Sequence, residues 1–451
     1  MLSAFANSFK IPELRQRILF TLAMTFVCRL VAIVPTPGVD AAALQAVIRE
    51  IESKTQGGFL SWIDLFSGGA LSNCAIGALS IWPYISASII LQMMTALVPA
   101  LERLAREGEP GRQKLTQYTR YFTLVICLVQ GLFLAITLEN PGALGIDRDI
   151  VIEKGWWFRI MTMVATTTGT MVLMWLGEQI TERGIGNGIS IVITVSIVSR
   201  VPAAIWAAIN MFRADPVTGT AHFTVFHLIG LLVLFFVVIA GTIALTMGQR
   251  KIPVHTAKRV VGRKVYGGQN IYMPLRVNYS GVMPIIFASA MLAFPAAILR
   301  RMPGFFKTIG TWLDMGEPLY LVMYALLILF FSYFWVATQF NPLQIADDLK
   351  KNGGYVPGIR PGRPTAEFLD KTMTRITFFG AACLTVIAVL PSVLTTMKDF
   401  KIPWLVASFF GGTSLLIIVG VALDTMRQVE SHLLMRHYDG FLRKGKLRGR
   451  R

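Results

Sequence analysis

The histidines and cysteines are the residues whose types could support metal binding or nucleophilic chemistry, and neither set has a suitable spacing. The sequence has five histidines and four cysteines but no H-E-x-x-H or C-x-x-C pair. We therefore expect no metal site, no disulfide framework and no metalloenzyme chemistry, and we interpret the cysteines as small buried hydrophobic residues. The residues concerned are His222, His227, His255, His432, His437, Cys28, Cys74, Cys127 and Cys383.

Nucleotide chemistry is not indicated either. No G-x-x-x-x-G-K-[ST] sequence occurs, so the chain is not expected to hydrolyse a nucleotide. The glycines of "GIGNG" (184–188) follow an apolar segment rather than a strand, and they lack the third glycine of a dinucleotide fingerprint. The sequence thus predicts a protein that is not an enzyme, binds no cofactor and draws energy from elsewhere.

The cysteines lie in or beside apolar segments long enough to cross a bilayer. Hydrophobic residues make up 54% of the 451 residues and charged residues only 15%, against roughly 25% charged in soluble proteins. The apolar blocks predict an all-α polytopic membrane protein with ten spans, the first of them retained rather than cleaved. The predicted spans are 18–35, 75–97, 121–138, 156–177, 188–208, 223–246, 277–298, 318–340, 372–391 and 403–423.

The basic residues indicate an orientation. With the N-terminus inside, the inner segments hold 30 Lys and Arg and the outer segments 11. This bias predicts that both termini are cytoplasmic. A net charge of +18 could also indicate nucleic-acid binding, but topology together with attraction to anionic lipids explains it better.

Two inner segments are unusually long and basic. Segment 247–276 contains seven Lys or Arg and no acidic residue, and segment 341–371 begins by alternating Pro, Gly and basic residues. Arg360 lies in "GIRPG" between Pro357 and Pro361, which stiffen the backbone around it. These segments are interpreted either as docking surfaces for a cytosolic partner or as solvated loops that set the topology.

One stretch does not fit the pattern of full spans. Phe66 to Asn73 contains two adjacent glycines and three polar residues directly before the apolar stretch from Cys74 to Leu97. It predicts a short, weak half-helix. From the residues alone, an ordinary re-entrant loop without a gating role is the favoured interpretation.

Three classes of function fit the spans. Ten spans divide into two halves of five. Because five is odd, the second half would cross the membrane in the opposite orientation to the first, as in the inverted repeats of many secondary transporters. The predicted spans contain no Asp or Glu, which disfavours ion coupling; the best polar candidates are Thr166 to Thr168 with Thr170, which helix packing also explains. A channel and a membrane scaffold with basic docking loops are the other two readings.

Five long motifs resemble the SecY family, which forms the channel of the bacterial protein translocase. The resemblance covers nearly the whole chain, with the motifs in the order expected for that family. They are "FSGGALSNCAIGALSIWPYISASIILQMM", "WLGEQITERGIGNGISI", "GQRKIPVHTAKRVVGRKVYGG", "NPLQIADDLKKNGGYVPGIRPG" and "FGGTSLLIIVGVALDTMRQVE".

This resemblance implies a fold of two inverted five-helix halves that close like a clamshell on a central pore. The halves would be 1–209 and 210–423, followed by a basic cytosolic tail, 424–451. The resemblance also implies a plug near 64–74 that seals the pore. We call its central part, Phe66, Ser67, Gly68, Gly69, Ala70, Leu71, Ser72 and Asn73, the plug segment. Many relatives carry Arg where this chain has Asn73, so a charge anchor at that position is absent.

The resemblance further assigns candidate site residues. Ile81 with Ile85, and Ile189 with Ile193, are i,i+4 pairs that would share a helix face. The lateral gate would pair Ser86 with Phe294. The implied pore ring is Ile81, Ile85, Ile189, Ile193, Ile286 and Ile417, and the implied docking residues are Lys258, Arg259, Arg263, Lys264 and Arg360.

The function implied by the resemblance is a protein-conducting channel in the bacterial cytoplasmic membrane. Unfolded secretory polypeptides would pass through it, and apolar signal sequences would leave sideways into the lipid. The partners implied are the small subunits SecE and SecG, the SecA motor and the ribosome. A ten-span secondary transporter remains the alternative.

Overall fold

The computed structural model describes most of the chain. The described residues are 11–40, 43–44, 64–140, 150–212, 225–256, 259–261, 264–266, 270–299, 304–313, 317–396, 402–410 and 412–444. The chain divides into two compact units: unit 1 comprises Met1–Ala207 with Val421–Arg451, and unit 2 comprises Ala208–Gly420.

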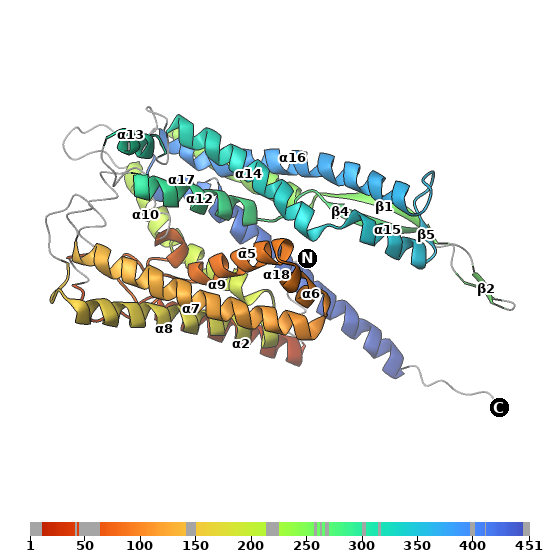
Figure 1. The fold of residues 1–451 in the computed structure, drawn as a ribbon, viewed down its shortest axis with the longest axis horizontal. Coiled ribbons are helices and arrows are strands. Elements are labelled where there is room, and N and C mark those ends of the chain that lie inside the picture. The colour runs from red at the N-terminus through yellow and green to blue at the C-terminus, as the bar shows by residue number, and fades with distance from the viewer. Residues whose placement is uncertain are drawn as a thin grey trace. The chain divides into compact units, whose positions relative to one another are not determined.

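Unit 1 is built from helices in which proline often sets the start. A proline lies in the first turn of α2, α5, α6 and α7, where its missing N–H leaves no hydrogen bond unmade. The long helices α7 and α8 pack side by side (Figure 1). The bounds are α2 (Pro12–Val31), α5 (Trp82–Leu97), α6 (Pro99–Arg106), α7 (Glu109–Glu139), α8 (Trp156–Arg183), α9 (Gly188–Val198) and α10 (Val201–Met211), the last of which runs into unit 2.

Unit 2 contains the remaining helices, and the last helix continues into unit 1. Helices α14 and α16 pack together along the unit (Figure 1). The bounds are α11 (Val225–Met247), α12 (Met283–Leu299), α13 (Phe305–Trp312), α14 (Pro318–Gln339), α15 (Pro342–Lys351), α16 (Arg363–Thr396), α17 (Trp404–Phe410) and α18 (Thr413–Lys444).

Each of the ten predicted spans overlaps a helix or two consecutive helices. Among the described residues, seven helical segments are long and apolar enough to cross a membrane, and the bent pair α5–α6 makes eight. The other two predicted spans coincide with α2 and with α12, which is only 17 residues long. The short helices α6, α13 and α15 lie between predicted spans.

The basic segment 247–276 contains β-structure, which the all-α prediction did not include. Strand β1 (Gln249–Thr256) pairs antiparallel with β4 (Asn270–Arg276) and with β5 (Gly354–Tyr355). Strands β2 (Arg259–Val261) and β3 (Lys264–Tyr266) form a separate pair. Along β1, Ile252 and Val254 are buried while Lys251 and Pro253 are exposed, so one strand face packs on the protein. That face joins a cluster with residues of α14 and α16.

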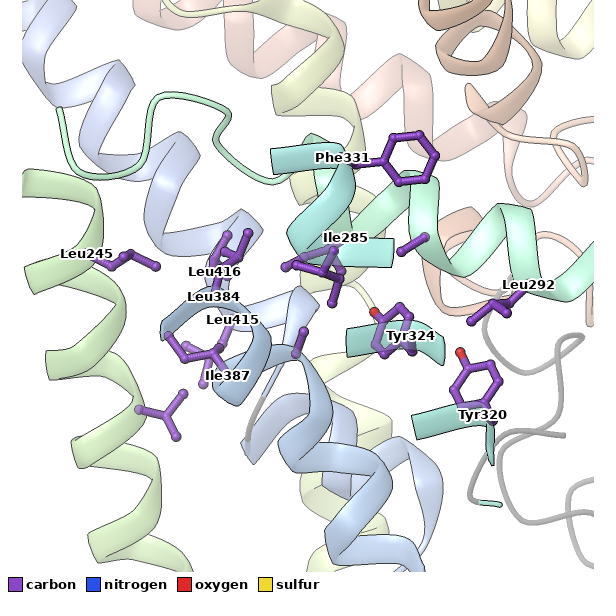
Figure 2. Packing of buried hydrophobic residues seen from close by; sticks show 14 residues of the cluster. Leu245, Ile285, Leu292, Tyr320, Tyr324, Phe331, Leu384, Ile387, Leu415 and Leu416 are labelled. Carbon is purple, nitrogen blue, oxygen red and sulfur yellow. The ribbon is translucent and has the colours of Figure 1, made fainter. Parts of the chain in front are cut away.

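The core of unit 2 is an apolar cluster shared by five helices (Figure 2). Ile285 of α12, Ile328 of α14 and Leu384 of α16 are almost fully buried. Tyr320 and Tyr324 of α14 stack with ring centroids 5.5 Å apart. This packing fixes α12, on which two of the candidate gate and ring residues lie.

The cysteine interpretation holds at three of four positions. Cys28, Cys74 and Cys127 are buried, whereas Cys383 on α16 is exposed. Its neighbours Phe378 and Phe379 are also exposed, as expected for a helix face that meets lipid.

Candidate functional site

The second predicted span is helical only over its last two thirds. Helix α5 begins at Trp82, with Ile81 as its N-cap, and Pro83 lies in its first turn rather than in the middle of a span. Ala75 forms an isolated β-bridge with Pro35, and residues 76–81 form turns. Cys74 and Ser80 have positive φ angles of 44° and 53°, which interrupt a helix. The prediction of a continuous helix from residue 75 is therefore wrong.

The plug segment is mostly turn and not the predicted half-helix. The described helical turn covers 64–67 and ends at Gly68 and Gly69, whose φ angles are 66° and 88°. Positive φ angles are readily adopted by glycine and stop a right-handed helix. Residues 68–73 continue as turns, with Gly69 N–H donating to the carbonyl of Asp64 at 3.0 Å.

Residues 74–77 are bonded to the chain that follows α2. The N–H groups of Ile76 and Gly77 donate to the carbonyls of Val34 and Val31, at 2.9 and 3.2 Å. A Cβ on Gly169 of α8 would lie 2.2 Å from the carbonyl oxygen of Ile76, so only glycine fits there. Non-helical backbone is tolerated at membrane depth when protein surrounds it and satisfies its polar groups, as it does here.

Side chains of unit 1 hold the plug segment. Arg29, in the last turn of α2, donates from Nη2 to the carbonyl of Gly68 at 3.1 Å. Arg200, just after α9, forms an ion pair with Asp64 and donates to Ser72 Oγ at 3.2 Å. Phe66 packs near Trp82, with ring centroids 6.3 Å apart. Residues 64–70 are all buried as a result.

Four of the six ring isoleucines lie in unit 1. Ile81 and Ile85 are joined by a backbone hydrogen bond of 3.1 Å, so they share one face of the first turn of α5, and both are buried. Ile189 and Ile193 lie one turn apart on α9 and are half-buried. Asn187 caps that helix by accepting from Ile189 N–H at 3.2 Å.

The other two ring candidates lie in unit 2. Ile286 is in the first turn of α12 and Ile417 is in α18, and both are buried. Five of the six isoleucines lie in helices that overlap predicted spans, and Ile81 is the N-cap of α5. Their assembly into one ring stays a prediction.

The lateral gate pair also spans the two units. Ser86 is half-buried on α5, and its hydroxyl donates to the carbonyl of Trp82 at 3.1 Å. Phe294 lies in α12 directly before Pro295, which is inside that helix; the side chain of Phe294 is outside the described residues. Their pairing stays a prediction.

Two of the four threonines proposed for a transporter site, Thr166 and Thr168, bond within α8, whereas the hydroxyls of Thr167 and Thr170 are buried without a hydrogen-bond partner among the described residues. Thr166 donates to the carbonyl of Thr162 at 2.8 Å, and its hydroxyl lies where a Cβ on Gly131 of α7 would clash. Thr168 is exposed and donates to the carbonyl of Val164 within α8. Small residues at a helix interface of this kind allow close approach of two spans.

The described residues also contain no group of His, Cys, Asp or Glu that could hold a metal ion.

Of the candidate docking residues, Arg360 is the one whose side chain is described. It is exposed between two turns in which Gly358 and Gly362 have φ angles of 79° and 101°. Its carbonyl accepts from the hydroxyl of Thr365 at 2.8 Å, which fixes the backbone before α16. Arg259 and Lys264 lie on β2 and β3, whereas Lys258 and Arg263 are outside the described residues.

Comparison with known proteins assigns the chain to a family. The SecY family model matches residues 75–426. The chain belongs to the SecY family. The SecY translocase subunit of Escherichia coli K12 is 45% identical over 444 residues, which cover 97% of this chain and 96% of that protein. The corresponding subunit of Chlamydia trachomatis is 42% identical and covers 98% of both chains.

Solved SecY-like structures share the fold. A protein-conducting channel has a TM-score of 0.61 and 17% identity, covering 92% of this chain and 91% of that chain. The Sec61 protein of a canine ribosome–channel complex has a TM-score of 0.57 and 15% identity. At these identities the likeness shows the fold.

Sequence reasoning missed the residues that hold the plug segment. Arg29 and Arg200 lie near span ends, where a basic residue is ordinarily explained by topology. Asp64 lies just before the plug segment and was assigned no role. The available signal was an acidic residue beside a glycine pair, together with two arginines within apolar surroundings, where a charge requires a partner.

Proposed function

We propose that the chain is the channel-forming subunit of a protein translocase. The single observation that carries this function is the match to SecY along almost the whole chain, at 42–45% identity. The fold is that of solved protein-conducting channels. The same match favours a channel over the transporter alternative.

In this function six isoleucines form the narrowest point of the pore. An apolar constriction offers an ion no substitute for its hydration shell, so it excludes water and ions at rest. The isoleucine side chains form no hydrogen bonds with a passing polypeptide, so they discriminate little among sequences and an unfolded polypeptide of any composition can pass. The placement of Ile81 and Ile85 on one face of α5 supports this arrangement.

The plug segment is proposed as a second barrier. It is buried, it lies directly before the helix that carries Ile81 and Ile85, and it has little regular structure of its own. Several of its hydrogen bonds are internal, such as Asn73 N–H to the carbonyl of Gly69 and Leu71 N–H to Ser67 Oγ, so the segment can move as one piece, which suits a movable seal. A related solved structure concerns a SecY plug domain that stabilises the closed state of its channel, at 16% identity.

Apolar signal sequences are proposed to leave through a lateral gate between α5 and α12. Transfer of apolar side chains from water to lipid is favourable, so the release needs no bond chemistry. Ser86 and Phe294 are the residues proposed to face one another there.

The basic inner loops are proposed to bind cytosolic partners. An exposed Arg360 held between two turns presents a planar group suited to carboxylates and RNA phosphates. The SecA motor and the ribosome are the proposed partners, and SecE and SecG are the proposed membrane subunits. Anionic lipids are proposed to bind the same basic segments at the membrane surface.

We place the chain in the bacterial cytoplasmic membrane with both termini inside. Single cysteines at Ile152 and Tyr272, which are 74% and 58% exposed, test this orientation in a variant without native cysteines. An impermeant maleimide added to intact cells should label position 152 and leave position 272 unlabelled. The opposite pattern would show that the orientation is inverted.

Depletion of the chain tests the function itself. Cells in which its synthesis is stopped should accumulate secretory precursors with uncleaved signal sequences, because the channel is lost. A transporter would instead give a defect in one class of solute, with precursors processed normally. Normal processing throughout depletion would overturn the channel function.

A further inference from the structure

Two arginines from different elements of unit 1 converge on one short segment. Arg29 belongs to α2, and Arg200 follows α9, so the two are far apart in the sequence. Arg29 Nη2 donates to the carbonyl oxygen of Gly68 at 3.1 Å, and Ser199 Oγ lies 3.3 Å from the same oxygen. Arg200 pairs with Asp64, which lies just before the plug segment, and donates to Ser72 near the end of that segment.

The carboxylate of Asp64 is the centre of this network. One of its oxygens pairs with Arg200, and the other accepts from Ser72 N–H at 2.8 Å. The Asp64 side chain is only 5% exposed and that of Arg200 is 21% exposed. A charge so deeply buried is strongly unfavourable without its partner. The closed position of the segment therefore depends on this pair.

The two glycines of the segment make room for the guanidinium groups. A Cβ on Gly68 would lie 2.5 Å from Nη1 of Arg29, and one on Gly69 would lie 3.3 Å from Cζ of Arg200. Any other residue would push one arginine away, in addition to the strain of a positive φ. The glycine pair is thus fitted to the arginines as well as to the turn.

We propose that Arg29, Arg200 and Asp64 form a polar latch that holds the plug segment closed. They are positioning residues: they do not line the path of the polypeptide but set how often the plug segment is in place. The latch rests on the proposed channel function and adds the groups that regulate it. When the segment leaves, water can solvate all three charges, so the latch is strong enough to close the pore and still reversible.

The test measures how often the segment is displaced. A single cysteine replaces Leu71 in the full chain without its native cysteines, in membranes, and the rate of labelling by an impermeant maleimide from outside is recorded. Asp64→Asn or Arg200→Gln should raise that rate about tenfold or more. Arg200→Lys, which keeps the charge, should give an intermediate rate. The double variant should be no faster than the faster single variant, because the pair is already lost.

A second ion pair of unit 1 provides the matched control. Arg159 on α8 pairs with Glu139 of α7 at 2.6 Å, and Glu139 is 4% exposed, similar to Asp64. Its groups do not contact the plug segment. Glu139→Gln should leave the labelling rate of position 71 unchanged, which separates loss of a latch from loss of any buried ion pair.

Resting conductance in planar bilayers is the second measurement, with brief openings expected in Asp64→Asn and absent in Glu139→Gln. Unchanged labelling and conductance in Asp64→Asn and Arg200→Gln would overturn the latch. If a single variant fails to accumulate, the double variant, which removes both charges, is tested in its place by the same labelling and conductance measurements. Secretion is also measured in the parent protein. If the parent secretes but the variants show unchanged labelling and conductance, only the latch is wrong. If the parent does not support secretion, the proposed function is wrong.

Discussion

The hydroxyl of Thr36 donates to the carbonyl oxygen of Cys74 at 2.6 Å, and the backbone N–H of Thr36 donates to the same oxygen at 2.8 Å. Thr36 lies in the chain after α2, and Cys74 follows the plug segment. Both residues are buried, with exposed fractions of 2%. These two bonds fix one end of the non-helical stretch before α5, so the plug segment has a fixed point from which to move.

Thr36→Val should destabilise the protein modestly. The variant loses the hydroxyl bond but keeps the backbone bond to the same oxygen, so the free energy of unfolding should fall by about 1 kcal/mol. Denaturant unfolding of the purified protein measures it. Thr168→Val is the control, because Thr168 is exposed and bonded only within its own helix. Equal losses in the two variants would show that the Thr36 bond has no special role.

Deleting 66–73 should give a flickering leak at rest, because one of two barriers is removed. Replacing Ile81 and Ile189 by Ser should give another, since polar side chains let water enter the constriction. The combined variant should conduct far more than either change alone. Single-channel recording without partner or substrate measures all three. A combined variant as silent as the parent would show that these residues do not form the seal.

Arg360→Glu should lower translocation about tenfold or more while expression and membrane insertion stay normal. The substitution reverses the charge of an exposed group proposed to contact a partner, and it removes no packing. Pulse-labelled export of a secretory protein is the measurement. Arg363→Glu, at a neighbouring exposed position, is the control and should export nearly normally. An equal loss in both variants would indicate a general charge effect.

Ser86→Cys with Phe294→Cys should form a disulfide under oxidation that blocks export until it is reduced. The proposed gate puts these two residues opposite each other, so the two thiols should come within bonding distance. Ser88→Cys with Phe294→Cys is the control, since residues two apart on a helix point in different directions. Failure of the first pair to cross-link in any state would count against the gate.

Much of the fold could be predicted from the sequence, because hydropathy reports which segments lie in the membrane. The break before Trp82 could not be predicted in this way. Residues 75–81 are apolar enough for a span, and hydropathy does not distinguish a helix from irregular backbone buried in protein. Pro83 was the available signal, since proline in the first turn is typical of a helix start.

The ion pair beside the plug segment could not be predicted from the sequence for a related reason. Arg200 and Asp64 are 136 residues apart, and only the packing of α2, α5, α8 and α9 in unit 1 brings them together. The strands of segment 247–276 were also missed. The alternation of buried and exposed residues in these strands is short. The basic residues of β1 made the segment look polar throughout, so Ile252 and Val254 were not recognised as buried positions.

The central claim is that a polypeptide passes through the pore lined by the isoleucines. A photo-activatable residue placed at Ile193 tests it with an export substrate arrested halfway by a folded domain at its C-terminus. Position 193 should cross-link to the arrested chain, while position Val129, which is 64% exposed on α7, should react with lipid instead. Cross-links to the substrate from Val129 and none from Ile193 would contradict the account.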